Sequence, residues 1–181
     1  MSFISKFVCL LFVSIMITQH SFADNTIYLT RHAEKMSTGK NPELDAIGQF
    51  RAKNIAAMLS SVGITHIFST DYNRTKQTAT PLAKYLNLEI QIYNPADLND
   101  FAEKLKKIDG AILVVGHSNT TPQLTALLSG KEIMPMQEKD YDTLYQVISN
   151  GVEKTVNHLR TIPSYILSPT VEIKIKANEN Q

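Results

Sequence analysis

Two arginines and two histidines of this chain lie where chemistry on a phosphate group would need them. Arg31 and His32 follow a short β-branched and aromatic run, and His117 directly follows a continuous apolar run. Arg74 lies near the expected start of a helix. A neutral imidazole can attack phosphorus and carry the phosphoryl group, and guanidinium groups bind the phosphate oxygens bidentately. These residue types therefore predict a phosphate-transfer pocket that uses a histidine nucleophile.

The elements around these residues decide whether they can meet. Strands are expected at 26–30, 65–69, 89–93 and 111–115, and helices at 45–62, 71–85, 98–107 and 122–128. The apolar run at 111–115 is typical of a strand buried on both faces of a parallel sheet. Pro81 is expected to kink or split the second helix.

The end of the chain adds a hairpin to this alternation. Asn150-Gly151 is a strong hairpin signal between two further strands, at 143–148 and 152–159. Strands that alternate with helices and end in a hairpin predict an α/β fold, a three-layer sandwich with a mostly parallel central sheet flanked by helices.

In such a sheet, ligands bind outside the carboxyl ends of the strands. Arg31-His32, Ser69-Thr70-Asp71 and His117-Ser118 all follow expected strands at their carboxyl ends. We therefore expect these three segments to converge, although each lies roughly 40 residues from the next.

Residues 1–23 are expected to be a signal peptide. Lys6 gives a positive start, residues 7–18 are apolar, and Ser21-Phe22-Ala23 is a small-x-small cleavage site. An uncleaved membrane anchor is less favoured, because the apolar run is shorter than the roughly 20 residues that span a bilayer. We expect a periplasmic or secreted protein with no membrane span after cleavage.

The composition limits the class of partner. Cleavage would remove Cys9, the only cysteine, and would leave 17 basic and 17 acidic residues. The net charge is then near zero, and the sequence contains no basic stripe. No nucleic-acid partner is therefore expected. Residues 24–162 are expected to form one domain, and residues 163–181 a C-terminal tail.

The ordered motifs resemble those of the histidine phosphatase superfamily, which is phosphoglycerate mutase-like in fold. The resemblance covers nearly all of residues 26–160. It rests on Arg31-His32-Ala33, on 44–48 (Leu-Asp-Ala-Ile-Gly), on Ser69-Thr70-Asp71 with Arg74 following, on 77–79 (Gln-Thr-Ala), and on Gly116-His117-Ser118.

The resemblance implies a role for each residue. His32 would be the nucleophile that becomes phosphohistidine, Arg31 and Arg74 would bind the phosphate oxygens, and His117 would stabilise the transition state. Ser69 and Asn119 are further candidates for contact with the phosphate, although they could simply end a strand and cap a helix. The implied enzyme is a phosphoric monoester hydrolase that needs no metal and no cofactor.

The general acid is less defined by the sequence. Relatives in this superfamily place a carboxylate after the second strand or after the second histidine, but here Ser118 follows His117. Asp97 and Glu34 are the remaining candidates, and each could instead have a capping or surface role. A good leaving group such as that of phosphohistidine needs little help from an acid.

The interval between Arg74 and His117 has room for one helix and a short strand, and not for a cap subdomain. We therefore expect a shallow, open pocket, as in small phosphohistidine phosphatases, which disfavours a mutase. The phosphorylated substrate could be a small molecule, a protein or an envelope glycolipid. Two alternatives stay open: a non-catalytic phosphate- or partner-binding module, and, less favoured, a metal-dependent hydrolase that would also use His66 and His158.

Overall fold

The structure is a computed structural model that describes residues 25–151, 153–163 and 166. The expected signal peptide (1–23) and most of the expected tail (163–181) lie outside the described residues. The elements in chain order are β1 Asn25–Arg31, α1 Ala46–Leu59, β2 Ile64–Ser69, α2 Asn73–Leu86, β3 Ile90–Ile92, α3 Leu98–Leu105, β4 Gly110–Gly116, α4 Thr120–Ser129, β5 Thr143–Ser149 and β6 Lys154–Arg160.

The strands form one sheet of six in the order β3-β2-β4-β1-β5-β6. β3, β2, β4 and β1 are parallel to their neighbours. β5 and β6 are added antiparallel at the β1 edge as a hairpin. The expected mostly parallel sheet is therefore confirmed, and the antiparallel hairpin extends it.

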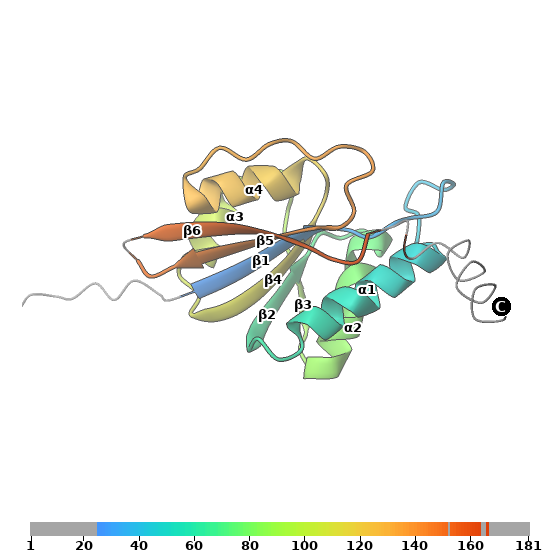
Figure 1. Ribbon diagram of the computed structural model, residues 1–181, viewed down its shortest axis with the longest axis horizontal. Helices are drawn as coiled ribbons and strands as arrows, with labels where there is room; N and C mark the ends of the chain where they lie inside the picture. Colours follow the sequence, from blue (N-terminus) through green and yellow to red (C-terminus); the bar gives the residue numbers. More distant parts are fainter. Residues whose placement is uncertain (1–24, 152, 164–165, 167–181) are drawn as a thin grey trace, which may run out of the picture.

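Helices cover both faces of this sheet, and the fold is a three-layer sandwich (Figure 1). On one face, Phe101 of α3 and Leu124 of α4 pack on a cluster that contains Leu29 and Val114 of the central strands. On the other face, residues of α1 and α2 pack on a second cluster, which contains Leu113 of β4. β4 contributes side chains to both clusters, as its continuous apolar sequence predicted.

Two local expectations can be compared with the structure. α2 is one helix from Asn73 to Leu86, so of the two effects expected of Pro81, a kink or a split, the split does not occur. Proline removes only one backbone donor, and the amphipathic helix is held by packing against α1 and the sheet. The hairpin between β5 and β6 has the expected Asn150-Gly151 at its turn, which is closed by a hydrogen bond from the backbone N–H of Asn150 to the carbonyl of Glu153.

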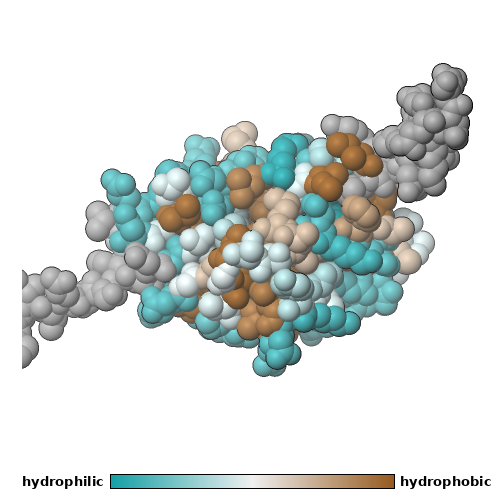
Figure 2. Space-filling model, turned by 60° about the horizontal axis from the view of Figure 1, so that its bottom comes forward, coloured by the Kyte–Doolittle hydropathy of each residue, from teal (hydrophilic) through white to brown (hydrophobic). Residues whose placement is uncertain are grey.

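Figure 2 shows one face of the molecule, on which hydrophilic side chains surround separate apolar patches. The largest exposed fractions of apolar side chains in the described part belong to Met134 (75%), Tyr85 (71%) and Phe50 (55%). No helix of the described ranges is both long and apolar enough to cross a bilayer.

Candidate active site

The strand register brings the three predicted segments together. Arg31 of β1 lies opposite Gly116 of β4, and Ser69 of β2 lies opposite Val115 of β4. The residues that follow these positions are His32, His117 and Thr70, and they leave the same edge of three adjacent parallel strands. The convergence predicted from the strand order is therefore observed.

His32 is held in one orientation. Its backbone N–H donates to the carbonyl of Gly116 at 2.9 Å, and its ring Nδ1 lies 2.8 Å from the carbonyl oxygen of Ala33. A carbonyl oxygen can only accept, so Nδ1 carries the proton and Nε2 keeps a lone pair. Burial lowers the pKa of His32, the bond to Ala33 opposes this, and the charges of Arg31 and Arg74 add to the lowering, so that the pKa is about 3. The ring is therefore a neutral imidazole at pH 7.

His117 is oriented by a chain of two threonine hydroxyls. Its Nε2 lies 3.0 Å from Thr70 Oγ1, which donates to Thr75 Oγ1, which in turn donates to the carbonyl of Tyr72. On the other side of the ring, Arg74 Nη2 lies 3.5 Å from Nδ1 and can only donate. Nε2 therefore carries the proton and Nδ1 accepts. Burial, followed by the charge of Arg74, lowers the pKa of His117 to about 4.

The two arginines are fixed by aromatic rings and by backbone. Arg31, which is 3% exposed, stacks on the ring of Tyr141 and donates to the carbonyl of Glu138 at 2.8 Å. The guanidinium of Arg74 lies 4.5 Å from the ring centre of Tyr72. Within the described residues, Nε of each arginine is buried without a hydrogen-bond partner. Both guanidinium groups therefore keep donor capacity.

These side chains line one cleft that is open to solvent. Its lining is Arg31, His32, Lys35, Tyr72, Arg74, Pro95, Ala96, His117, Ser118, Asn119 and Thr120. With both histidines neutral, the charges on this lining come from two arginines and one lysine. A cleft with this charge suits a phosphate dianion.

Asn119 lines the cleft, and its side chain does not cap the helix that follows. It is the N-cap residue of α4, but its side chain makes no cap hydrogen bond. The amino end of α4 is thus directed towards the cleft, where its backbone N–H groups favour an anion.

Three predicted residues are not among those that line the cleft. Ser69 is fully buried and donates to the carbonyl of Thr70, so it ends its strand. Asp97 is exposed and accepts a hydrogen bond from the side chain of Asn94 at 2.6 Å. Ser69 therefore has no access to a substrate, whereas Asp97 directly follows Pro95 and Ala96 of the cleft lining, and its role as general acid stays a prediction.

Glu34, the third of these residues, has a structural partner. Its carboxylate receives two hydrogen bonds from Arg51, from Nε at 2.8 Å and from Nη2 at 2.6 Å. Arg51 is fully buried and also donates to Thr161 Oγ1 and to the carbonyl of Ile162. Glu34 therefore connects β1 to α1 and to the segment after β6, and it is not available as a general acid. The residues that line the cleft include no aspartate or glutamate.

Two glycines of the motifs have steric roles. A Cβ atom at Gly48 would overlap the backbone carbonyl of Glu34, so only glycine lets α1 lie this close to the segment after β1. A Cβ atom at Gly116 would come 2.8 Å from the hydroxyl of Tyr93 and 3.0 Å from the hydroxyl of Thr120. Both motif glycines therefore let the backbone beside a cleft histidine pack tightly.

Lys35 and Thr70 are site residues that the sequence reasoning missed. Lys35 lies three residues after His32 and lines the cleft, but its type and spacing alone did not distinguish it from the other lysines. Thr70 lies inside a quoted motif, but its bond to His117 depends on how β2 and β4 pair.

The histidines of the metal-hydrolase alternative lie apart. His66 stacks on Phe68, and His158 stacks on Tyr145. Throughout the described ranges, no group of three His, Cys, Asp or Glu side chains is placed to hold a metal ion.

Residues 27–102 match the family model of the histidine phosphatase superfamily, branch 1. The probable phosphoglycerate mutases GpmB of Salmonella arizonae and Salmonella newport are 32% identical over 94 residues. That match covers 48% of this chain and 40% of the relative, so the chain spans well under half the length of these relatives.

Solved structures with the same fold cover most of the described part. The protein histidine phosphatase SixA complexed with tungstate aligns with a TM-score of 0.60 and 18% identity, covering 75% of this chain and 96% of that chain. A putative alpha-ribazole-5'-P phosphatase from Escherichia coli aligns with a TM-score of 0.63, with the same identity and coverage. The fold is thus that of histidine phosphatases, and the resemblance to this superfamily is confirmed.

Proposed function

We propose that this protein is a phosphatase that transfers a phosphoryl group to His32 and then to water. One observation carries the proposal: the proton of His32 is held on Nδ1 by the carbonyl of Ala33, which leaves the Nε2 lone pair beside two arginines. A positioned, neutral imidazole next to guanidinium groups is what covalent phosphoryl transfer needs.

In the first step, the Nε2 lone pair forms a bond to phosphorus while the bond from phosphorus to the leaving atom breaks. Arg31, Arg74 and Lys35 offset the charge on the three non-bridging oxygens. Nδ1 of His117 accepts in the free protein, and a proton taken up there would make it a donor to one of these oxygens. Nearby phosphate charge favours that protonation.

In the second step, water attacks phosphorus and the bond to Nε2 breaks. The products are inorganic phosphate and neutral His32, with the surplus proton released to solvent. The cleft is open, so water reaches the intermediate easily, which favours a phosphatase over a mutase. Every charge needed is supplied by side chains, so we propose that turnover needs no metal.

The substrate class follows from the absence of a carboxylic acid among the residues that line the described cleft. An alkoxide leaving group needs protonation, and general acid catalysis contributes roughly 10²–10⁴-fold. An imidazole leaves far more easily. We therefore propose substrates with good leaving groups, with phosphohistidine on a protein as the leading case. The fold similarity to the protein histidine phosphatase SixA supports this choice.

A rate comparison tests this substrate class. We expect kcat/KM for a phosphohistidine peptide to exceed that for an alkyl phosphate such as glycerol phosphate by at least about 100-fold. Both assays contain EDTA. Equal rates on the two substrates would show that an acid is present and would reject this substrate class.

A binding module is the second candidate, and the absence of aspartate and glutamate from the described cleft lining favours it. It predicts that the protein binds inorganic phosphate or tungstate without hydrolysing p-nitrophenyl phosphate. The phosphatase predicts hydrolysis of this activated ester in EDTA, with loss in His32→Ala.

We also propose export, supported by the apolar run at 7–18 and the cleavage pattern that ends at Ala23. The test is the mass of the protein recovered from the periplasm or the medium. A chain that begins at Asp24 is expected, and full-length protein retained in the membrane would contradict the proposal.

A further inference from the structure

The loop between α4 and β5 holds Arg31 of the catalytic cleft, mainly through its backbone. Nη1 of Arg31 donates to the carbonyl of Glu138 at 2.8 Å and to that of Gln137 at 3.4 Å. The guanidinium lies 4.1 Å from the ring centre of Tyr141. The loop carbonyls therefore occupy one side of the guanidinium, and the tyrosine ring covers one of its faces.

The opposite edge of the guanidinium keeps its donors. Nε of Arg31 is buried and has no hydrogen-bond partner among the described residues. Nη2 makes only long contacts, at 3.5 Å to the hydroxyl of Tyr141 and at 3.7 Å to the carboxylate of Glu138, which is 86% exposed. Nε and Nη2 are the parallel donors with which an arginine binds a phosphate bidentately. Arg31 is thus held from one side, and this edge is left for two oxygens of an anion.

Asp140 closes the turn that carries the two carbonyls. Its carboxylate accepts from the backbone N–H of Gln137 at 2.6 Å, and its own N–H donates to the carbonyl of Gln137 at 3.1 Å. A hydrogen bond from a backbone N–H to a carboxylate is charge-assisted and stronger than a neutral one. These two bonds fix the conformation of residues 137–141, which we call the Arg31 turn.

The Arg31 turn is anchored on both sides. Before it, Met136 packs on the core cluster beneath α3 and α4. After it, the carbonyl of Asp142 accepts from the backbone N–H of Thr161 at 2.8 Å, and its carboxylate pairs with Arg160 at 2.9 Å. Because both ends are fixed, the conformation of the turn determines where its carbonyls lie.

We propose that Asp140 is a positioning residue for phosphate binding. By closing the Arg31 turn it fixes the two carbonyls, which direct the Nε–Nη2 edge of Arg31 towards two oxygens of the bound phosphate. Asp140 acts only through Arg31, since it is not among the residues that line the cleft. The proposal rests on phosphate binding in the cleft, which is part of the proposed function, but it does not require turnover.

Equilibrium binding of tungstate, an analogue of phosphate, tests the proposal. Asp140→Ala removes the acceptor for Gln137, so the Kd for tungstate should rise at least about tenfold, as for the loss of one hydrogen bond to a charged group. Removing a negative charge alone would strengthen anion binding, which is the opposite sign. Asp140→Asn keeps an oxygen that accepts and should stay within about threefold of the wild type. Glu132→Ala, an exposed acid of the same loop, is the matched control and should not weaken binding.

A double-mutant cycle separates positioning from general damage to the fold. Arg31→Lys keeps the charge but lacks the paired donors. In this background, Asp140→Ala should weaken tungstate binding much less than it does in the wild type. An equal effect in both backgrounds would show that Asp140 does not act through Arg31 and would overturn the proposal.

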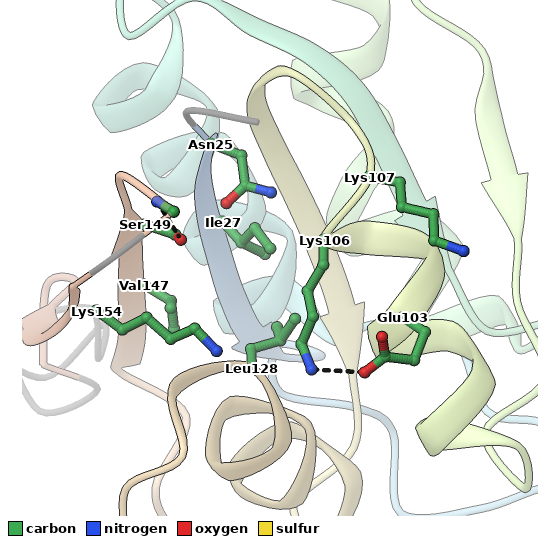
Figure 3. A pocket seen from close by; sticks show the side chains of 10 residues that line it. Asn25, Ile27, Glu103, Lys106, Lys107, Leu128, Val147, Ser149 and Lys154 are labelled. Carbon is green, nitrogen blue, oxygen red and sulfur yellow. Dashed lines mark hydrogen bonds and ion pairs between the residues drawn. The ribbon is translucent and has the colours of Figure 1, made fainter. Parts of the chain in front are cut away.

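Lysines away from the cleft can also attract tungstate, and they provide a control for the site of binding. Lys106 and Lys154 line a cavity of about 300 Å³ at the other end of the sheet, where β1 begins (Figure 3). Lys106→Gln combined with Lys154→Gln should leave the Kd unchanged. A loss of tungstate binding in this variant would place the anion at these lysines and contradict the proposal.

The two proposals fail in different ways. Equal tungstate affinity of Asp140→Ala and the wild type, or no rescue by Asp140→Asn, would overturn the role of Asp140 alone. Tungstate binding that depends on Asp140 in a protein without turnover would support this role and reject only the phosphatase. A wild-type protein that does not bind tungstate would overturn both.

Discussion

At the scale of single residues, the site depends on which ring nitrogen of each histidine carries a proton. Ala33 fixes the proton of His32 on Nδ1, and Thr70 with Arg74 fixes that of His117 on Nε2. These contacts come from backbone and from a threonine, which are groups that a search for catalytic residue types does not select.

Thr70→Val should therefore impair catalysis through His117. Valine keeps the shape but cannot accept from Nε2, so the ring loses the contact that fixes its tautomer. We expect kcat to fall at least about tenfold, with a loss of about 1 kcal/mol in the free energy of unfolding. Thr70→Ser restores the hydroxyl and should restore kcat. An unchanged kcat in Thr70→Val would exclude the positioning role.

The lowered histidine pKa values predict a definite dependence of stability on pH. The pKa values of His32 and His117, about 3 and about 4, lie below the unfolded value of 6.5. Between pH 6.5 and about pH 4 the unfolded chain binds more protons, so the free energy of unfolding should fall as the pH is lowered. Above pH 6.5 their contribution is complete.

NMR titration of the two rings and urea unfolding at several pH values measure these effects. Replacing both histidines with glutamine should flatten the dependence in this window. A midpoint near 6.5 for either ring in the folded protein would show that burial does not keep the pair neutral.

The residue types that do phosphate chemistry were accessible from the sequence alone. Arg31, His32, Arg74 and His117 converge on the cleft as predicted. Ser69 lies in one of the motifs and Glu34 directly follows another, but both side chains are buried away from the cleft lining. A motif identifies a segment, and the direction of each side chain depends on register and packing, which one sequence does not specify.

At the scale of elements, close packing of α1 positions the segment that carries the nucleophile. Asp45 caps α1 by accepting from the backbone N–H of Gly48, and Gly48 in turn touches the backbone of Glu34. The backbone after β1 is thus held from outside by a helix that contributes nothing to the cleft lining.

Gly48→Ala should separate these two segments. The added Cβ meets backbone and not a flexible side chain, so α1 must shift, and overpacking of this kind costs about 1–3 kcal/mol. Thermal or urea unfolding measures the loss. Gln49→Ala, at the exposed neighbouring position, is the control and should stay within about 0.5 kcal/mol of the wild type. Equal stability of Gly48→Ala and the control would contradict this packing role.

The elements themselves were largely predictable. Apolar patterns together with turn signals identified the four helices and six strands of the described ranges, because the core selects for apolar patterns. The helix break that Pro81 could cause does not occur, since tertiary contacts hold α2 together beyond one lost hydrogen bond.

At the scale of the whole molecule, Arg51 connects the two ends of the described domain. It donates to Glu34 after β1 and to Thr161 and Ile162 after β6. The sequence showed Arg51 only as one of four arginines, because its partners are 17 and more than 100 residues away.

Arg51→Met should be strongly destabilising. Removing one partner leaves the carboxylate of Glu34 buried without its guanidinium, which costs about 3–5 kcal/mol. Lys53→Met, at an exposed position of the same helix, is the control and should have little effect. Combining Arg51→Met with Glu34→Leu should recover part of the loss. A stability of Arg51→Met equal to that of the control would reject a structural role for this pair.

The central claim is that His32 carries the phosphoryl group, and trapping that group tests it most directly. Wild-type protein is mixed with a phosphoramidate donor, quenched at alkaline pH and analysed by mass spectrometry of intact protein and peptides. We predict one added phosphoryl group on the peptide that contains His32, labile to acid and absent in His32→Ala. Hydrolysis of the donor by wild-type protein with no phosphoryl group on His32, or equal turnover by His32→Ala, would contradict the account.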